Sequence, residues 1–534
     1  MATCGEVLIE LLEAYGVEVV FGIPGVHNVE LYRGLSRSTI RHVTPRHEQG
    51  AGFMADGYAR VTGKPGVCFT ITGPGLTNIL TAMGQSYADS IPMLVISSCI
   101  SRSELNSAQG RLHELPSQRD LARGVSALSY TVLSPDQLPE IVARAFALFA
   151  GGRPRPVYIE IPVDVIAMPA DHLPRTPRAL PHRPLPPSAD IAAAAEAIRA
   201  AKRPMLVVGG GAVGAPAAVR AFAERLDAPT ILTINARGLL PPAHPLIAGE
   251  LLTNPPLKAA LEAADLVVAV GTEFGETEMY PVPEVFTFSG TLVRIDIDPD
   301  QVTRPSPADV PLVGDAGATL EALLAALGPA TTGGDGATRA AGLRQASARA
   351  LPAGTDVYER VMAAIDAALP DAVIVGDSTQ TVYFANQFYR PKSPRSFFNS
   401  STGYGTLGYA VPAAVGARLG TPKERPVVVL VGDGGILFTI GELAAAVEAR
   451  AAIVIVVWNN DGYGEIRNYM RGRQIAPIGT DLLVPDLVAI AKGFGCAAER
   501  VESRAALADA LTRAGDFPLP TLIEIREDAD FLKG

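Results

Sequence analysis

Two hydrophobic stretches of the chain end in small polar residues that could hold a metal ion and a phosphate group. The stretch PVVVLV runs into GDGG, which contains Asp433, and the stretch AIVIVVW runs into NNDG, which contains Asn460. Carboxylate and amide oxygens are hard ligands that suit Mg²⁺. Neighbouring glycines let backbone N–H groups face a phosphate. Each segment alone is also an ordinary turn sequence, so only the two together predict a magnesium–diphosphate site.

The spacing of these segments predicts that they lie on neighbouring strands. Residues 435–458 separate Gly434 from Asn459, which leaves room for one connecting helix at about 440–450. A connection of this length is typical of two parallel strands, whose carboxyl ends share one edge of a sheet. Ligands of open parallel sheets bind at that edge. We therefore expect the carboxylate and the amide to lie a few ångströms apart.

The wider sequence alternates short apolar strands with helix-like segments, which is typical of doubly wound parallel sheets. We predict an α/β protein of three domains, with residues 1–170, 190–328 and 353–534 each forming a doubly wound, mostly parallel sheet. A proline-rich stretch at 169–190 and a Gly-, Thr- and Ala-rich stretch at 328–345 are predicted linkers. A length of 534 residues is compatible with three such units.

Composition argues against several classes of protein. The net charge is −10 and no basic stripe occurs, so we expect no nucleic-acid partner. The longest apolar runs have the length of strands, and the N-terminus lacks the basic and apolar parts of a signal peptide. The four cysteines have no CxxC spacing, which disfavours disulfides and structural zinc. We therefore expect a soluble cytoplasmic protein without a membrane partner.

The GDGG and NNDG segments at this spacing resemble the signature of thiamine-diphosphate-dependent enzymes. The resemblance is to the group of acetolactate synthases, pyruvate decarboxylases and benzoylformate decarboxylases, and it covers the whole chain. It implies a pyrimidine-binding, a central and a diphosphate-binding domain, with thiamine diphosphate and Mg²⁺ as cofactors. By position, Asp433, the Asn460 side chain and the Gly462 carbonyl would ligate Mg²⁺. The other cofactor-binding positions implied are Thr379, Gln380, Gly405, Leu407, Gly432, Gly434 and Gly435.

The segment RHEQGAGFMADGYAR resembles the family's catalytic glutamate segment and makes Glu48 the acid at the pyrimidine ring. A carboxyl hydrogen-bonded to this ring favours the imino tautomer of the cofactor, which removes the thiazolium C2 proton. Without the metal segments, an ion pair with Arg46 or a helix-start acid near the helix dipole would be the favoured interpretation of Glu48. The resemblance also implies that the glutamate of one subunit completes the site of another, so we expect a homodimer or homotetramer.

The residues that select the reaction depart from several family patterns. Acetolactate synthases carry two arginines in R-F-D-D-R, where this chain has EFGET at 273–277, and a tryptophan at the position of Tyr469. Pyruvate decarboxylases carry an acid at the position of Val26 and two adjacent histidines, of which only His113 matches. His113 is a candidate proton donor or a loop-capping histidine. Gln118 is a candidate for the family's glutamine near the thiazolium.

The segments GIPGVHNVELYRGL and NNDGYGEIRNYM are similar to those of a subgroup, the 2-ketoarginine (5-guanidino-2-oxopentanoate) decarboxylases. Glu465 follows the metal loop, where a carboxylate could pair bidentately with a guanidinium group. Val26, Ile466 and Tyr469 are the other expected substrate contacts. Alternatively, Glu465 is solvated and paired with a neighbouring arginine. We expect a 2-oxo acid decarboxylase that converts 5-guanidino-2-oxopentanoate to 4-guanidinobutanal and CO₂.

Three alternatives remain open from the sequence. The first is a carboligase, like acetolactate synthase, that joins two carbonyl substrates. The second is a flavin- or nicotinamide-dependent oxidoreductase, because Gly209, Gly211 and Gly214 form a G-x-G-x-x-G motif with Asp227 about 20 residues further on. The third is a non-catalytic nucleotide-binding or regulatory protein, which would not need Glu48. Flavin adenine dinucleotide (FAD) is possible as a bound cofactor but is not expected to be needed.

Overall fold

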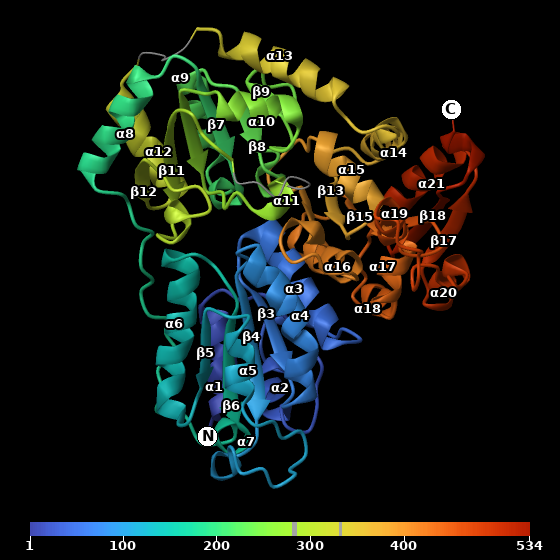
Figure 1. Cartoon of the computed structure of the whole chain (residues 1–534). Helices are drawn as coiled ribbons and strands as arrows, with labels where there is room; N and C mark the ends of the chain where they lie inside the picture. The colour runs from blue at the N-terminus through green and yellow to red at the C-terminus, as the bar shows by residue number, and fades with distance from the viewer. Residues whose placement is uncertain (280–285, 330–333, 534) are drawn as a thin grey trace. The chain divides into compact units, whose positions relative to one another are not determined.

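Three parallel sheets of six strands form the framework of the chain (Figure 1). The structure is a computed structural model and describes residues 1–279, 286–329 and 334–533. The strand orders are β2-β1-β3-β4-β6-β5, β12-β11-β10-β7-β8-β9 and β14-β13-β15-β16-β18-β17. The predicted α/β class with three parallel sheets is therefore confirmed. Each predicted domain range contains the strands of one sheet, while the domain limits themselves stay a prediction.

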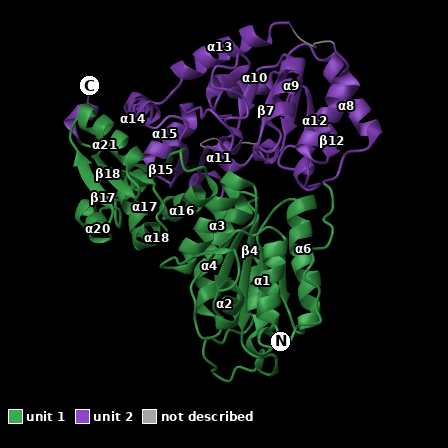
Figure 2. Ribbon diagram, turned by 180° about the vertical axis from the view of Figure 1, so that it is seen from behind, with its two compact units in different colours: residues 1–182, 404–528 green, residues 183–403, 529–534 purple. Residues whose placement is uncertain are grey.

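The chain divides into two compact units (Figure 2). Unit 1 comprises residues 1–182 and 404–528, and unit 2 comprises residues 183–403 and 529–534. Unit 1 therefore contains the first sheet together with strands β15 to β18. Unit 2 contains the central sheet together with β13 and β14.

The first sheet of unit 1 is built from fully parallel pairs, as in β3 with β4, where Gly66 pairs with Met93 and Thr70 with Ser97. Its strands are β1 (Val19–Gly22), β2 (Arg41–Val43), β3 (Gly66–Thr70), β4 (Met93–Cys99), β5 (Leu128–Thr131) and β6 (Val157–Pro162). Its helices are α1 (Cys4–Ala14), α2 (Val29–Leu35), α3 (Glu48–Thr62), α4 (Pro74–Ala88), α5 (Gln118–Arg123), α6 (Leu138–Gly151) and α7 (Val163–Ile166).

The C-terminal part of unit 1 contains the two stretches with polar ends. Its strands are β15 (Val427–Gly432), β16 (Val454–Asn459), β17 (Ala497–Val501) and β18 (Thr521–Arg526). Its helices are α16 (Ala410–Gly420), α17 (Asp433–Leu437), α18 (Glu442–Glu448), α19 (Gly464–Gly472), α20 (Leu487–Gly493) and α21 (Arg504–Asp516). β15 and β16 are parallel neighbours, with Val428 opposite Val454 and Gly432 opposite Trp458.

Unit 2 has the same alternation of strands and helices. Its strands are β7 (Pro204–Val208), β8 (Thr230–Leu232), β9 (Ile247–Gly249), β10 (Leu266–Val270), β11 (Thr291–Asp296), β12 (Val310–Val313), β13 (Val373–Gly376) and β14 (Phe397–Asn399). Its helices are α8 (Ser188–Ala200), α9 (Pro216–Leu226), α10 (Pro255–Glu262), α11 (Glu276–Met279), α12 (Ala316–Leu327), α13 (Gly336–Arg349), α14 (Thr355–Ala368) and α15 (Gln380–Phe388).

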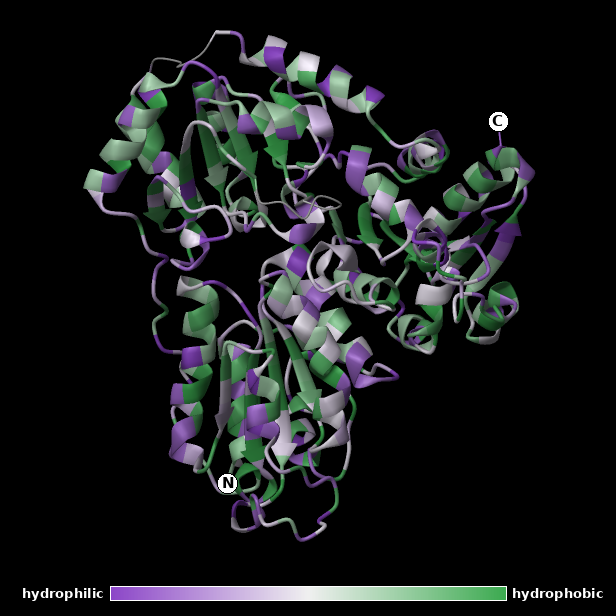
Figure 3. Cartoon of the chain, viewed as in Figure 1, coloured by the Kyte–Doolittle hydropathy of each residue, from purple (hydrophilic) through white to green (hydrophobic). Residues whose placement is uncertain are grey.

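The strands are rich in hydrophobic residues, and the helices around them carry both hydrophobic and hydrophilic residues (Figure 3). All residues of β3, β4, β7 and β10 are buried, as expected for strands covered on both faces. Among the described residues, no helix is long and apolar enough to cross a membrane.

The second predicted linker is partly wrong. Helix α13 (Gly336–Arg349) occupies most of the range 328–345 that composition assigned to a linker. Its sequence, GATRAAGLRQASAR, is rich in alanine and arginine, which are strong helix formers. Only part of the glycines and threonines that suggested a linker precede this helix, because Gly336, Thr338 and Gly342 lie within it. The first linker agrees better, because no helix or strand occurs between α7 and Ser188.

The G-x-G-x-x-G motif of the central sheet has a packing role in this structure. A Cβ atom at Gly209 would lie 2.2 Å from the Gly271 carbonyl oxygen, and the Gly211 N–H donates to the same oxygen over 3.0 Å. Asp227 caps the end of α9, before β8, and accepts a hydrogen bond from the Gly336 N–H. A ribose-binding acid would lie after the second strand instead. The motif therefore gives the oxidoreductase alternative no support.

Candidate active site

The tips of β15 and β16 lie against each other, as the spacing predicted. Asp433 accepts hydrogen bonds from the Gly462 N–H over 2.7 Å and from the Asn460 N–H over 3.4 Å. Both tips belong to unit 1, and Asp433 begins α17 directly after β15. The predicted closeness of the acid and the amide segment is therefore confirmed.

The chemistry of this site fits a divalent cation. The Asp433 side chain is only 1% exposed, and burial raises its pKa above the usual value. Among the described residues, neither lysine nor arginine forms an ion pair with it, and its hydrogen-bond donors are backbone N–H groups. A buried carboxylate without a cationic partner is costly unless a cation is bound. The Asn460 amide and the Gly462 carbonyl would complete a set of hard oxygen ligands.

Glycines at the tips allow the close packing that shapes this site. A Cβ at Gly434 would lie 2.8 Å from the ring of Tyr463, so a larger residue would displace that ring. Gly462 has a φ of +140°, and a Cβ there would lie 2.1 Å from the Thr480 carbonyl oxygen. The backbone around the predicted metal ligands is therefore fixed by contacts that only glycine permits.

The Gly405–Leu407 segment forms a braced loop at the start of the C-terminal part of unit 1. The backbone N–H and the hydroxyl of Thr406 both donate to Gln85 Oε1, over 3.4 Å and 3.1 Å. The Thr439 hydroxyl donates to the Gly408 carbonyl over 2.7 Å. Gly405 itself is exposed with a φ of +75°. Leu407 is half-buried. The loop is thus held on both sides, while its predicted cofactor-binding residues remain accessible.

Glu48 is the first residue of α3 and is held by a residue that the sequence did not single out. Its side chain is 8% exposed, and the Asn78 amide donates to Glu48 Oε2 over 2.9 Å. No described residue donates to Glu48 Oε1. Asn78 therefore occupies one carboxyl oxygen and leaves the other for a ligand, which suits an acid that must carry its proton on a defined atom.

Glu442 is a second residue that the sequence reasoning missed. Its carboxylate accepts the backbone N–H groups of Arg46 and His47, each over 3.0 Å, and so fixes the loop before Glu48. A Cβ at Gly50 would lie 2.3 Å from Glu442 Oε1, so Gly50 makes room for the carboxylate. The one acidic residue in the stretch ILFTIGELAAAV was the available signal.

We expect Glu442 to make folding stability depend on pH. Burial chiefly, and the charge of Glu48 in addition, raise the pKa of Glu442 from 4.5 to about 7. The stabilisation tied to the protonated carboxyl is complete below about pH 4.5 and is lost as the pH rises through about 7. A pKa difference of this size corresponds to about 3 kcal/mol. Glu442→Gln should therefore remove this loss, measured by urea unfolding of the apo protein at pH 5 and pH 8.

Glu448→Gln is the matched control, because Glu448 lies on the same helix but its side chain is 57% exposed and pairs with Arg46. Its pH dependence of stability should equal that of the wild type. An equal dependence in Glu442→Gln would contradict the role assigned to the buried carboxyl.

Loops after β1 to β4 bring the predicted pyrimidine-side residues to one edge of the first sheet. Val26 follows β1, Glu48 follows β2 and His113 follows β4. Carboxyl ends of parallel strands share an edge. Val26 is 70% exposed there, and His113 is half-buried. The structure therefore places these predicted residues along one edge.

Gln118 lies at the same edge but is fully engaged by protein groups. Its Oε1 accepts the Gly73 N–H, and its Nε2 donates to the Ser98 carbonyl and the Tyr158 hydroxyl, each over 3.1 Å. The side chain is 5% exposed. Both amide hydrogens are taken, so Gln118 has none free for a ligand. A role in holding the Gly73 turn fits this geometry better than the predicted direct contact, which stays untested.

The three predicted substrate residues of the C-terminal part share the exposed surface of α19. Ile466 is 52% exposed, Tyr469 is 51% exposed, and Glu465 is also exposed. Arg467 pairs with Asp481 over 2.9 Å, and no described residue forms an ion pair with Glu465. Glu465 is solvated, as the alternative expected, but its pairing with Arg467 or Arg471 is not observed among the described residues, and the carboxylate is available to a cationic ligand.

Two predicted diphosphate-binding residues lie in unit 2. Thr379 follows β13 and is 8% exposed, and Gln380 begins α15. The amino end of such a helix carries unpaired N–H groups that suit a phosphate. Their contribution to the same site as Asp433 stays a prediction.

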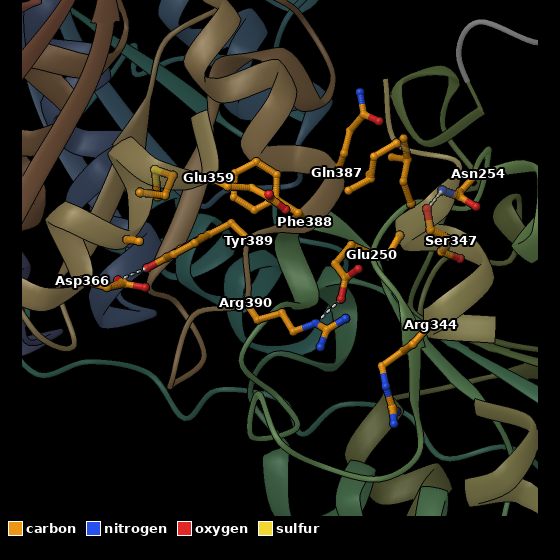
Figure 4. A pocket seen from close by; sticks show the side chains of 15 residues that line it. Glu250, Asn254, Arg344, Ser347, Glu359, Asp366, Gln387, Phe388, Tyr389 and Arg390 are labelled. Carbon is orange, nitrogen blue, oxygen red and sulfur yellow. Dashed lines mark hydrogen bonds and ion pairs between the residues drawn. The ribbon is translucent and has the colours of Figure 1, made fainter. Parts of the chain in front are cut away.

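Unit 2 also has a pocket of about 420 Å³, lined by residues of α13, α14 and α15, by neighbouring residues and by the segment before α10 (Figure 4). Glu250 pairs with Arg390, and the Tyr389 hydroxyl donates to Asp366 over 3.0 Å. None of the predicted site residues lines this pocket. The pocket therefore shares no residue with the predicted cofactor site.

The predicted residues of unit 1 fall into two groups. Glu48, Val26, His113 and Gln118 lie along the first sheet, while the metal ligands and the α19 residues lie at the tips of β15 and β16. Among the described residues, no hydrogen bond or ion pair joins Glu48 to Asp433, Asn460 or Gly462.

Comparison with known proteins identifies the family. The model of the thiamine pyrophosphate enzyme N-terminal TPP-binding domain matches residues 2–121, the central-domain model matches 191–323, and the C-terminal TPP-binding-domain model matches 377–525. The chain belongs to the thiamine pyrophosphate enzymes. The family resemblance read from the GDGG and NNDG segments is therefore confirmed, and so is thiamine diphosphate as the cofactor of the family.

Similar proteins include a decarboxylase and several synthases. A probable 2-ketoarginine decarboxylase of Pseudomonas aeruginosa is 48% identical, covering 98% of this chain and 94% of the relative. The acetolactate synthase isozyme 1 large subunit of Escherichia coli is 33% identical over 99% of this chain and 94% of the relative. A solved structure of a candidate thiamin diphosphate-dependent enzyme from Mycobacterium smegmatis has a TM-score of 0.83 and 29% identity, and the match covers 98% and 99% of the two chains.

Proposed function

We propose that this thiamine pyrophosphate enzyme decarboxylates 5-guanidino-2-oxopentanoate to 4-guanidinobutanal and CO₂. The observation that carries the proposal is the 48% identity over 98% of the chain with a probable 2-ketoarginine decarboxylase. The exposed Glu465 beside the predicted metal ligands supports it, because a guanidinium group needs an anionic partner. A cytoplasmic location is part of the proposal, supported by four free and buried cysteines.

In the proposed mechanism, each group of residues has a separate task. Asp433, Asn460 and Gly462 would hold Mg²⁺, and Thr379, Gln380 and the glycines near Asp433 would hold the diphosphate. Bound thiamine diphosphate supplies the ring that takes up the electron pair when CO₂ leaves. Glu48 would donate a hydrogen bond from Oε1 to the aminopyrimidine, while Asn78 keeps Oε2 occupied. His113 would donate a proton to the substrate carbon that has lost CO₂.

We further propose that two copies of the chain form each site. Large apolar side chains remain exposed beside both groups of predicted residues in unit 1, which is typical of a surface covered by a partner. These side chains include Val26, Val29 and Leu112 near the first sheet and Phe438, Ile466, Tyr469 and Ile478 in the C-terminal part. A homodimer, or a tetramer built from dimers, would bury them and would bring Glu48 of one copy to Asp433 of the other.

The substrate proposal predicts a clear order among 2-oxo acids. With thiamine diphosphate and Mg²⁺, the purified protein should release CO₂ from 5-guanidino-2-oxopentanoate faster than from pyruvate or from an uncharged straight-chain 2-oxo acid. Equal or faster turnover of pyruvate would reject the guanidinium substrate.

Glu465→Gln should selectively weaken use of the guanidinium substrate. Charged hydrogen bonds contribute about 1.5–3 kcal/mol, so kcat/KM should fall about 10- to 100-fold for this substrate. For the uncharged 2-oxo acid, kcat/KM should stay within about twofold, and this comparison is the internal control. A similar loss with both substrates would show that Glu465 supports the fold or the cofactor rather than the guanidinium.

Carboligation is the second candidate function, favoured by 33% identity to acetolactate synthases over nearly the whole chain. Such an enzyme would join the decarboxylated fragment to a second carbonyl compound. Product analysis by mass spectrometry separates the two functions, because only carboligation yields a C–C coupled product.

A further inference from the structure

Two histidines that are far apart in the sequence meet at the carboxyl edge of the first sheet. His27 lies in the loop after β1, and His113 lies in the loop after β4. Their ring centroids are 5.2 Å apart, and the rings are perpendicular at 90°, so the edge of one imidazole faces the other ring. No pattern in the sequence predicts this contact.

The loop that carries His27 is rigidly braced from within. The Asn28 side chain is fully buried, with Oδ1 accepting the Gly25 N–H over 2.7 Å and Nδ2 donating to the Ile23 carbonyl over 3.1 Å. These two hydrogen bonds join Asn28 to Gly25 and Ile23, so they close the loop that contains His27. The backbone of His27 is therefore fixed by its sequence neighbour.

The loop that carries His113 is braced in a similar way. The Glu114 carboxylate accepts the Arg111 N–H over 2.9 Å and the Gln109 N–H over 3.4 Å. His113 has a φ of +66°, a left-handed conformation that is unfavourable for a residue with a side chain. Gly73 packs so closely on it that a Cβ there would lie 2.4 Å from the His113 carbonyl oxygen. The surrounding structure thus holds His113 in a strained conformation.

The His27 ring is poorly suited to carry a proton of its own. Its Nδ1 is buried and forms no hydrogen bond with any described residue. Burial, and in second place the charge of His113, lower the pKa of His27 below its usual value. Both effects favour the neutral form of the His27 ring.

We propose that His27 is a positioning residue for His113, and that the two imidazoles act as one coupled acid. The structure supplies what such a pair needs, namely two braced loops, ring contact and a buried nitrogen without a partner. The catalytic part of this inference rests on the proposed decarboxylase function, whereas the coupling of the two rings does not.

The coupled pair delivers a single proton in the reaction. When the substrate carbon has lost CO₂, an N–H bond of protonated His113 breaks and a C–H bond forms, using the electron pair that CO₂ left behind. His113 becomes neutral, and a proton from water restores it. His27 stays neutral throughout and keeps the His113 ring in place edge-on.

The other charged groups around the pair are engaged elsewhere. On α2, Glu30 pairs with Arg33 over 2.6 Å, and Arg111 pairs with Glu104 over 2.6 Å. Glu114 is occupied by backbone N–H groups, and Glu48 at the start of α3 is bonded to Asn78. Only His113 contributes a charge effect to the shift of the His27 pKa. The coupling between the two histidines is therefore the interaction to test.

The first test needs no catalysis. The chain has seven histidines, and NMR titration of the full-length protein, with resonances assigned from single variants, reports each ring separately. His113→Phe keeps an aromatic ring but removes the charge, so the midpoint of His27 should rise by about half a pH unit, the effect of two unit charges about 5 Å apart in a water-like dielectric. His172, which is exposed and pairs with Asp136, should be unchanged. An unmoved His27 midpoint would overturn the coupling.

The second test measures the pH dependence of kcat in the holoenzyme. His113→Phe should lower kcat about 100-fold or more, as for loss of a general acid. His27→Phe should lower kcat less than His113→Phe does and should leave KM nearly unchanged. In the pH profile of kcat, the two apparent ionisations of the coupled pair should become one. The double variant should be no slower than His113→Phe alone, because residues that act as a unit are non-additive. A His27→Phe profile with the shape of the wild type would reject the positioning role.

The two tests separate this inference from the proposed function. A wild-type protein that decarboxylates no 2-oxo acid, but whose His27 midpoint responds to His113→Phe, would refute the function and retain the coupled pair. Decarboxylation of the 2-oxo acid with no coupling in the NMR titration would retain the function and refute the coupled pair.

Discussion

Asp433→Ala should abolish binding of Mg²⁺ and thiamine diphosphate, and with it all cofactor-dependent activity. The side chain is almost fully buried at the joined tips of β15 and β16, and its partners in the described chain are backbone N–H groups. Loss of a residue that merely orients a metal ligand costs 10–100-fold in affinity. Loss of the ligand itself should therefore raise the Kd for the metal at least about 100-fold, measured by isothermal titration of Mg²⁺ in the presence of the cofactor.

Asp461→Asn is the matched control for this prediction. Asp461 lies between the predicted ligands Asn460 and Gly462, but Arg526 donates two hydrogen bonds to its carboxylate, over 2.8 Å and 2.7 Å. This variant should bind Mg²⁺ with nearly wild-type affinity. Tight cofactor binding by Asp433→Ala would show that the joined strand tips are an ordinary pair of turns, and the central premise of the proposed function would fail.

Glu48→Gln should lower kcat about 10²–10⁴-fold, the usual contribution of a positioned acid or base. Glutamine keeps the shape and can still accept from Asn78, but it cannot exchange a proton with the aminopyrimidine. Cofactor affinity and thermal stability should stay close to wild type, so the loss should appear in kcat. Near-normal kcat would remove Glu48 from the mechanism and leave it as a helix-start acid.

A mixed dimer of the Glu48→Gln and Asp433→Ala chains is a stringent control for the shared site. If Glu48 of one copy serves Asp433 of the other, one of the two sites in each mixed dimer has both residues intact. Random mixing should then restore about one quarter of the wild-type activity. No recovery in a preparation shown to contain mixed dimers would place both residues of a site on one chain.

The strand tips show how much the sequence could predict about the site. Asp433 and Asn460 were predicted to lie together because strand length, helix spacing and the geometry of parallel sheets are all local properties. The observed bond from Gly462 to Asp433 agrees. By contrast, Asn78 and Glu442 hold the Glu48 segment from positions 30 and 394 residues away, and no periodic pattern encodes such contacts.

Composition misled the prediction where two physical effects competed. The range 328–345 has the small residues of a linker, but its second half has the alanine and arginine content of a helix, and helix propensity prevailed in α13. The G-x-G-x-x-G motif was ambiguous for a similar reason. Glycine serves close backbone packing as well as phosphate binding, and only the contact with Gly271 showed which use applies.

The sequence by itself determined the family and its thiamine diphosphate cofactor and predicted the residues that would hold it, because these depend on short segments whose spacing sets their geometry. The tertiary structure decided which side chains brace those segments and which partners they have. It showed Gln118 fully engaged by the protein, Glu465 without an ion pair in the described chain, and His27 against His113. Such pairings depend on how separate loops pack, and packing is a property of the folded chain as a whole.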